Sequence, residues 1–297
     1  MNLADQSRPD EGMAAMAAEL AREDRVREAI GAVLPHLVGG EDAMALGEEP
    51  VVRTRATLLS LADDLLRRGG GTGNAATLHQ ALANSAALLA HCHGLALETA
   101  TSERLAAAGL DPVLSPWLEE LLGGETGRAA LAMRTISAQA RFVARQRRMG
   151  ADVAELPAEL MHAALLALAD LPGGPGDQGA AALRAAYDEG RTRLSLLAQV
   201  VLAGSEFGER VLDPSAAGFA LFATALAARS GAPRQEVLLA SSTGQEFRLL
   251  LLMRAAGASA EATGSALALI HPEGRLPGDW LDISHEAAGA LLAGAAA

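Results

Sequence analysis

The sequence predicts an all-α protein of stacked helical hairpins, arranged either as an α-solenoid or as an irregular multi-helix array. Three observations predict this class. Half of the 297 residues are hydrophobic but only 3% are aromatic, a composition typical of closely packed Ala- and Leu-rich helices. Apolar residues recur at helical spacing through most of the chain. Gly and Pro clusters, rather than strand signals, separate these stretches.

Helix signals in the first half of the chain are periodic apolar residues bounded by caps and breakers. Helices are predicted at 11–37, 51–68, 75–99, a shorter stretch before 111, 116–122, 126–149 and 157–170. Asn74 is expected to cap the helix at 75–99, and Thr126 the helix at 126–149. Gly150 is expected to end that helix in a left-handed conformation.

The second half repeats this organisation. Helices are predicted at 180–203, 215–229, a short stretch after Pro233, 246–257 and 260–271. Residues Thr243 to Glu246 have the spacing of a capping box, and Ser259 is expected to cap the following helix. The helix at 246–257 is apolar almost all round, so it is expected to be buried rather than to serve as the recognition helix of a helix-turn-helix.

Gly-rich and Pro/Gly-rich segments suggest a domain organisation. The predicted units are N-terminal helices at 1–68, a Gly-rich linker at 69–74, a central helical subdomain at 75–171, a Pro/Gly linker at 172–179, a C-terminal helical subdomain at 180–272 and a tail with one short helix at 273–297. Weakly similar stretches that begin at Gln139 and Gln245 suggest two related halves, although Ala-rich sequences also match one another by chance.

Charge and residue usage exclude several classes of function. All 24 cationic Lys and Arg residues are Arg, so the chain lacks the Lys of Schiff-base enzymes, P-loop NTPases and protein kinases. A net charge of -12 disfavours non-specific binding to nucleic acid or to an anionic membrane. The single Cys and the shortness of the apolar runs predict a cytoplasmic protein without a membrane segment.

His91, Cys92 and His93 form the most conspicuous candidate metal cluster. On a helix, however, the two imidazoles point about 160° apart, so they cannot share one ion. Cys92 has apolar neighbours one turn away and no local base. We therefore expect a buried structural thiol flanked by half-exposed histidines, with no metal and no cofactor. Gly71, Gly73 and Ala76 match the spacing of a dinucleotide-binding loop but do not follow a strand, so a plain linker is favoured.

The helix at 126–149 carries the best candidate site. Four arginines lie within about 40° of one another around its axis, namely Arg134, Arg141, Arg145 and Arg148. Four apolar or small residues are expected on the opposite, buried side, namely Met133, Ile136, Ala140 and Val143. The sequence has no acidic residue between Gly127 and Gly150. This stripe is either a solvated face clamped by acids of a neighbouring helix, or a docking surface for an anionic partner.

Several runs resemble a known bacterial family. They are Gln139–Phe142 through Arg148–Met149 to Glu155–Leu160, and Phe219 to Pro272 with its Arg254–Gly257 and Ile270–Pro272 motifs. The last two thirds of the chain are similar to the family known as domain of unknown function 2336 (DUF2336). The resemblance implies an all-helical, HEAT-like bacterial protein, and it carries over no catalytic residue.

Together these observations favour a non-enzymatic protein-protein interaction or scaffold module of the bacterial cytoplasm. Arg134, Arg141, Arg145 and Arg148 are expected to contact its protein partner, for which an acidic protein is one candidate. The alternative is a binder of nucleic acid or another phosphate-bearing ligand through the same arginines. An enzyme is the third hypothesis, because no nucleophile, base and orienting group can be placed together.

Overall fold

The computed structural model describes residues 7–39, 49–70, 73–174 and 176–295, and these residues contain helices but no strand. The helices are α1 (Ser7–Gly39), α3 (Glu49–Gly69), α4 (Ala75–Ala83), α5 (Ala86–Ala107), α6 (Pro116–Leu122), α7 (Thr126–Gln146), α8 (Ala158–Ala169), α9 (Gly176–Ala186), α10 (Arg193–Ala203), α11 (Pro214–Ala217), α12 (Phe219–Ser230), α13 (Arg234–Ala240), α14 (Glu246–Ala255), α15 (Ala260–Ile270) and α16 (His285–Ala295). Short 3₁₀ helices are η1 (Val153–Glu155), η2 (Glu189–Arg191), η3 (Ser205–Leu212) and η4 (Gly278–Asp282). The all-α class predicted from the sequence is confirmed, in the form of a multi-helix array.

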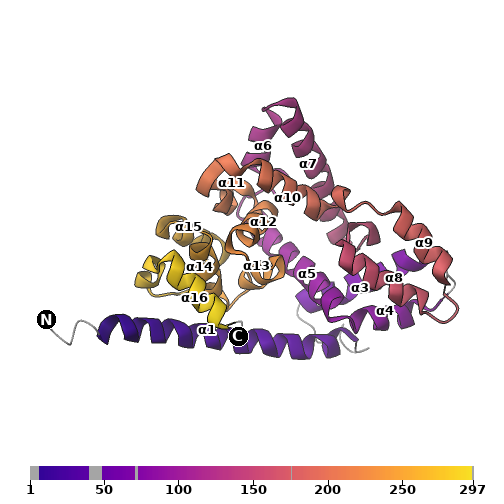
Figure 1. The fold of residues 1–297 in the computed structure, drawn as a ribbon, viewed down its shortest axis with the longest axis horizontal. Helices are drawn as coiled ribbons and strands as arrows, with labels where there is room; N and C mark the ends of the chain where they lie inside the picture. The colour runs from indigo at the N-terminus through magenta and orange to yellow at the C-terminus, as the bar shows by residue number, and fades with distance from the viewer. Residues whose placement is uncertain (1–6, 40–48, 71–72, 175, 296–297) are drawn as a thin grey trace.

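The helices enclose three apolar cores. One lies among α3, α4, α5, α8 and α9, and a second joins α6, α10, α12, α13, α14 and α15. The third is formed where α1 and α16 pack against α14. Figure 1 shows the resulting outline: α1 runs along the base, α8 and α9 lie at one corner, and α6 and α7 form the apex. As predicted, α14 is buried, with Leu249 to Met253 fully shielded from solvent.

The first core includes helices on both sides of each predicted linker. α3 and α4 pack together across 69–74, and α8 packs on α9 across 172–179. The second linker is shorter than predicted, because α9 already begins at Gly176. The domain boundaries themselves stay a prediction, as does a regular repeat of the HEAT type.

Three predicted helices are each interrupted. The helix predicted at 75–99 ends at Ala83, and α5 starts after Ser85 and continues to Ala107. The apolar spacing runs through this break, but the Ser85 hydroxyl accepts a hydrogen bond from the Leu88 amide and starts a new helix there. The segment 180–203 divides into α9 and α10, and the segment 215–229 divides at Gly218, which adopts a φ of 73° between α11 and α12.

The end of α7 also differs from the prediction. Its last helical residue is Gln146, and the left-handed position is Met149, with a φ of 52°, rather than Gly150. The Gly150 amide donates to the Arg145 carbonyl, which is the hydrogen bond of a Schellman ending. A Cβ on residue 150 would lie 3.1 Å from the Cγ of Arg145, a tight contact that a small shift of the Arg145 side chain would have to relieve, and no positive φ is present at Gly150. At the other end Thr126 is the first helical residue and makes no cap.

The start of α14 is capped by a distant residue. The predicted capping box at 243–246 is absent, because no side chain of that segment accepts from the first turn of α14. Instead, the buried carboxylate of Glu23 in α1 accepts hydrogen bonds from the amides of Phe247 and Arg248, at 2.9 and 2.8 Å. Gln245 donates to the Glu23 carbonyl, and Arg248 pairs with Asp24. These contacts hold α1 against the body of the protein.

Candidate interaction surfaces

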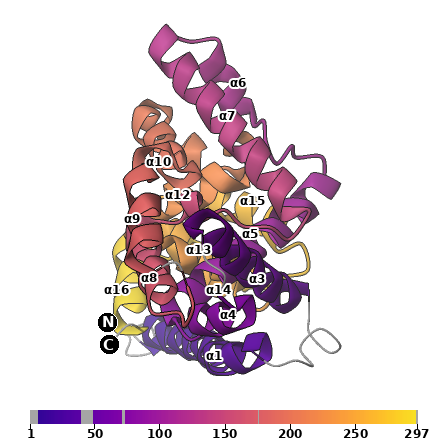
Figure 2. The ribbon, with the colours of Figure 1, turned by 90° about the vertical axis from the view of Figure 1, so that its right-hand side faces the viewer.

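α7 is the most projecting helix of the fold. It packs against α6 and α10. Figure 2 shows α6 and α7 extending away from the other helices. One long face of α7 is therefore left to solvent. This is the helix on which the sequence places four aligned arginines.

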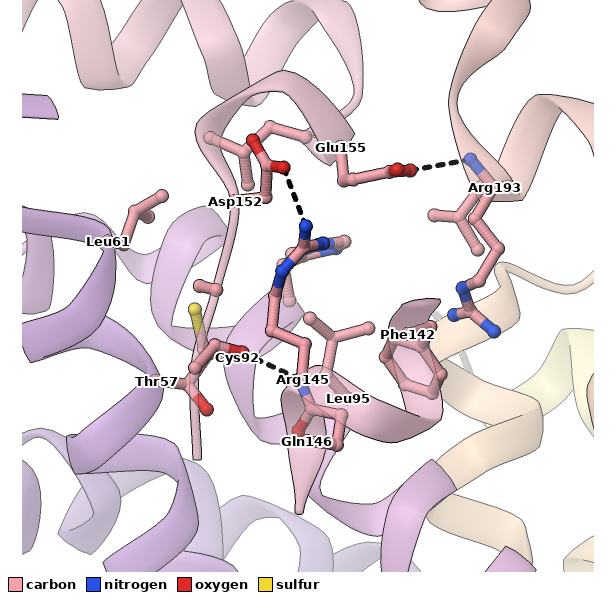
Figure 3. A pocket seen from close by; sticks show the side chains of 15 residues that line it. Thr57, Leu61, Cys92, Leu95, Phe142, Arg145, Gln146, Asp152, Glu155 and Arg193 are labelled. Carbon is pink, nitrogen blue, oxygen red and sulfur yellow. Dashed lines mark hydrogen bonds and ion pairs between the residues drawn. The ribbon is translucent and has the colours of Figure 1, made fainter. Parts of the chain in front are cut away.

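Arg145 does not belong to the exposed face. Its guanidinium donates to the Asp152 carboxylate at 2.8 Å, and its side chain is 28% exposed. Arg68 of α3 donates to the other oxygen of the same carboxylate, also at 2.8 Å. Figure 3 shows Arg145 and Asp152 pointing toward each other above the end of α7. Asp152 thus ties the chain after α7 both to α7 through Arg145 and to α3 through Arg68. Arg145 is paired with an acid, as in one of the two alternatives from the sequence, but this acid lies in the turn after α7 and not on a neighbouring helix.

The other three arginines remain on the outside. Arg134, Arg141 and Arg148 are exposed, and within the described part of the chain none of them has an ion pair or hydrogen bond from its side chain. They follow one another at seven-residue intervals, which is about 10 Å per step along a helix. Arg148 lies in the turn directly after α7.

Small residues run beside these three arginines with the same period. Ala130, Ser137 and Ala144 are all exposed, and the Ser137 hydroxyl is hydrogen-bonded to the Met133 carbonyl within the helix. Small side chains allow the backbone of another helix to approach closely. We call Arg134, Arg141 and Arg148 together with Ala130, Ser137 and Ala144 the α7 face.

The predicted buried side of α7 is wrong. Met133 is 55% exposed and Ala140 is exposed, whereas Ile136 and Val143 are half-buried. The buried side chains of α7 are Ala132, Thr135, Ala138, Gln139 and Gln146. Helix α7 is turned in this way because its two glutamines bind partners inside the protein: Gln139 donates to the Pro112 carbonyl, and Gln146 to the Gly150 carbonyl. Polar anchors therefore override the apolar pattern.

A buried ionic cluster lies beneath α7. Glu98 of α5 is fully buried and receives two hydrogen bonds from Arg193 of α10 and two from Arg234 of α13, at 2.7 to 3.1 Å. Arg193 also donates to Gln139 and stacks on the ring of Phe142, 3.7 Å from its centroid. Burial alone raises the pKa of Glu98, but the two arginines reverse this and hold it well below its usual range. The cluster joins four helices and has all its charges paired.

The cavity next to this cluster is small. It measures about 40 Å³ and lies between Cys92, Phe142, Arg145 and Arg193 (Figure 3). That volume has room for a few water molecules, far below the several hundred Å³ of an ordinary ligand pocket. Asp152 and Glu155 at its edge are occupied by Arg145 and by the Arg193 amide, and the buried Thr57 hydroxyl is a lining polar group without a hydrogen-bond partner in the described residues.

The residues His91, Cys92 and His93 have structural surroundings. Cys92 is buried as predicted, and burial raises the pKa of its thiol to about 12. The half-exposed histidines predicted beside it are instead buried, with exposed fractions of 4% and 9%. Burial, together with Arg234 and Arg193, lowers the pKa of His91 to about 4. Across the described ranges no group of three His, Cys, Asp or Glu side chains could hold a metal ion.

A second surface, which the sequence did not single out, lies along α1. An open apolar groove of about 660 Å³ runs between α1, the start of α3, the middle of α5 and the end of α13. Val26, Ile30, Val33 and Leu37 form the α1 wall, while Leu97 and Leu239 lie on the opposite wall. These four α1 residues are 39 to 47% exposed. The sequence does contain a signal for this groove. The apolar residues of α1 are spread over a wider arc around the helix axis than one neighbouring element can bury.

No protein-family model, no curated protein and no solved structure matches the chain. The resemblance to DUF2336 therefore stays a prediction. No helix within the described ranges is both long and apolar enough to span a membrane.

Proposed function

We propose that this protein is a non-enzymatic interaction module of the bacterial cytoplasm that binds an acidic helical segment of a partner protein on the α7 face. The observation that carries the proposal is the row formed by Arg134 and Arg141 on the projecting helix α7 and Arg148 in the turn directly after it, all exposed and without an acidic partner in the described residues. A guanidinium group can bind a carboxylate through two parallel hydrogen bonds, and this row presents one guanidinium group for every two helical turns.

The use of arginine elsewhere in the chain supports this interpretation. Arg53 and Arg104 bind carbonyls at the ends of other helices, and Arg193 and Arg234 neutralise Glu98. Arg145 is tied to Asp152. Arginines that serve the fold are thus paired, whereas Arg134, Arg141 and Arg148 have no side-chain partner in the described residues. The exposed side chains of Arg25, Arg147, Arg184 and Arg191 also have none, but they do not form a row along one helix. The small residues beside them leave room for a second helix.

A phosphate-bearing ligand is the alternative occupant of the same arginines, but no observation favours it. Single-stranded nucleic acid is normally bound on aromatic platforms, and the only aromatic side chain of α7, Phe142, is covered by Arg193. The net charge of -12 also opposes a polyanion. Nucleic-acid binding is accordingly an outcome that the test below would reveal.

A designed peptide tests the proposal. The probe is a fluorescent helical peptide of about six turns with Glu at every seventh position beside an alanine seam, and its counterpart carries Lys at those positions. We expect the Glu peptide to bind and the Lys peptide not to bind, measured by fluorescence anisotropy. Reversing all three arginines, as R134E/R141E/R148E, should weaken binding of the Glu peptide at least about fivefold, since three exposed charge pairs contribute roughly 1–3 kcal/mol together.

The matched control is the triple variant R184E/R191E/R275E. It makes the same change in net charge at exposed arginines on other parts of the surface. We expect it to bind the Glu peptide as the parent protein does. Equal weakening in both triple variants, or equal binding of the Glu and Lys peptides, would show that the α7 face is an ordinary solvated surface. Stronger binding of a single-stranded oligonucleotide than of the Glu peptide would favour the alternative.

A further inference from the structure

The groove along α1 concentrates apolar surface that the fold itself does not use. Val26, Ile30, Val33 and Leu37 are spaced by four, three and four residues, which is the spacing of a coiled-coil seam. The same helix already buries Met16, Leu20, Leu34 and Val38 against the body of the protein. α1 therefore has two adjacent apolar stripes, and only one of them is covered. We call Val26, Ile30, Val33 and Leu37 the α1 seam.

The α1 seam is complementary to itself. When two copies of α1 run antiparallel about a point midway between Ile30 and Val33, Val26 of one copy meets Leu37 of the second copy, and Ile30 meets Val33. The spacing of four, three and four reads the same in both directions, as an isologous two-fold contact requires. Each α1 then enters the groove of the other copy, where it contacts a second apolar wall at Leu97 and Leu239.

Charge does not oppose this pairing. Of the acidic residues on this part of α1, Glu19 is paired with Arg22, Asp24 with Arg27 and Arg248, and Glu23 is buried at the start of α14. Glu28 lies about 160° around the helix from Ile30, away from the α1 seam. The exposed Arg25 residues of the two copies would stand about 20 Å apart along the paired helices. Each copy thus presents an uncharged stripe to the other, although the whole chain is acidic.

We propose that a second copy of this chain binds along the α1 seam, so that the protein is a two-fold symmetric dimer with paired α1 helices. The two surfaces favour different partners. The α7 face favours a partner with acidic residues, because its arginines are unpaired. The α1 seam offers no such charges and requires an apolar stripe of matching spacing, which α1 itself supplies. The two-walled groove lets the contact extend beyond a single helix pair toward the ~800 Å² per partner of an ordinary interface.

The oligomeric state of the full chain tests this proposal. Size-exclusion chromatography with light scattering should give about twice the chain mass of 30.4 kDa. Val33→Asp places an unpaired carboxylate in the centre of the α1 seam, and it should raise the dimer dissociation constant at least tenfold. Because Val33 is 47% exposed in one copy, its replacement should leave the helical circular dichroism and the melting of the monomer intact.

The matched control is Leu166→Asp, an exposed leucine in the middle of α8 with an exposed fraction of 51%. This variant should remain dimeric. A parent protein that is monomeric at about 100 µM would overturn the proposal, and would leave the groove to a different partner. A dimer that survives Val33→Asp would also overturn it, because the contact would then lie elsewhere. Neither result depends on the peptide experiment on the α7 face.

Discussion

At the scale of single residues, the fold depends on buried polar side chains that bind one another. Glu98 with Arg193 and Arg234 connects α5, α10 and α13, and Gln139 adds α7 to the same cluster. Removing Glu98 would leave two largely buried guanidinium groups without their counter-charge, which typically costs several kcal/mol. His91 lies near the same two arginines. Unlike Glu98, which is buried in its charged form, His91 is buried in its neutral form.

His91 should make the protein sensitive to acid. The pKa of its imidazole is lowered to about 4 in the folded protein, first by burial and then by Arg234 and Arg193. Between the ordinary value of 6.5 and about 4, the unfolded chain binds a proton that the folded protein does not. This contribution to stability is therefore present above pH 6.5 and is lost as the pH falls, by about 2 kcal/mol at pH 5.

Urea denaturation at pH 8 and pH 5 checks this prediction. The variant His91→Gln should lose less stability on acidification than the parent protein, by about 2 kcal/mol. The control His36→Gln changes an exposed histidine of α1 and should follow the parent. An unchanged acid response in His91→Gln would mean that this imidazole is not held neutral.

At the scale of elements, the helices hold one another by their ends. Arg53 donates to the Gln146 carbonyl at the end of α7, and Arg104 donates to the carbonyl of Ser241, directly after α13, and to that of Ile270 at the end of α15. At the start of α14 the Glu23 carboxylate of α1 accepts hydrogen bonds from two backbone amides that have no partner within the helix. Element packing is therefore fixed by polar contacts between residues that lie far apart in the sequence.

The contact of Glu23 should respond to pH in the sense opposite to that of His91. Burial raises the pKa of Glu23 to about 7, with Glu19 and Glu246 adding to the rise and the amides of Phe247 and Arg248 opposing it. Between 4.5 and about 7, the folded protein holds a proton that the unfolded chain has released. The contribution is thus fully present below pH 4.5 and is lost as the pH rises through 7.

The variant Glu23→Gln isolates this effect. On going from pH 8 to pH 5 the parent protein should gain about 2–3 kcal/mol from Glu23 that the variant lacks, so the variant should be destabilised more by acid than the parent. The two single variants, Glu23→Gln and His91→Gln, should therefore change the pH dependence of urea denaturation in opposite directions. Changes of the same sign would contradict the assignment of Glu23.

Strong local signals explain which elements were predictable. Asn74, Ser115 and Ser259 stand at helix starts and accept hydrogen bonds from the first turn, as their residue types predict. The break at Ser85 was missed because Ala and Leu continue the helical spacing on both sides of it. The capping of α14 could not be foreseen, since Glu23 lies more than two hundred residues away in the sequence.

The candidate site on α7 was predictable only where its geometry depends on the helix itself. Helical geometry alone aligns Arg134 and Arg141, and both are exposed. The separate role of Arg145 depends on Asp152, which lies beyond the helix and approaches only because the chain turns back at Met149 and Gly150. The rotation of α7 was missed because its buried face is defined by Gln139 and Gln146, whose partners come from the turns before and after the helix.

At the scale of the whole molecule, the two surfaces lie on different sides. Figure 1 shows α1 at the base and α7 at the apex, with the three cores between them. An apolar seam on one side and a row of arginines on the other are compatible with a scaffold that pairs with itself and holds a second protein. Salt separates the two contacts: screening weakens binding to the α7 face but not the pairing of two acidic chains along α1.

The central claim, that the α7 face holds a partner protein, is tested most directly by quantitative capture from an extract of the source cell. The baits are the parent protein, R134E/R141E/R148E and the control R184E/R191E/R275E, each with its melting checked beforehand. The account predicts at least one protein that is retained by the parent and the control and is lost from the α7 variant. The same set of proteins on all three baits would contradict it.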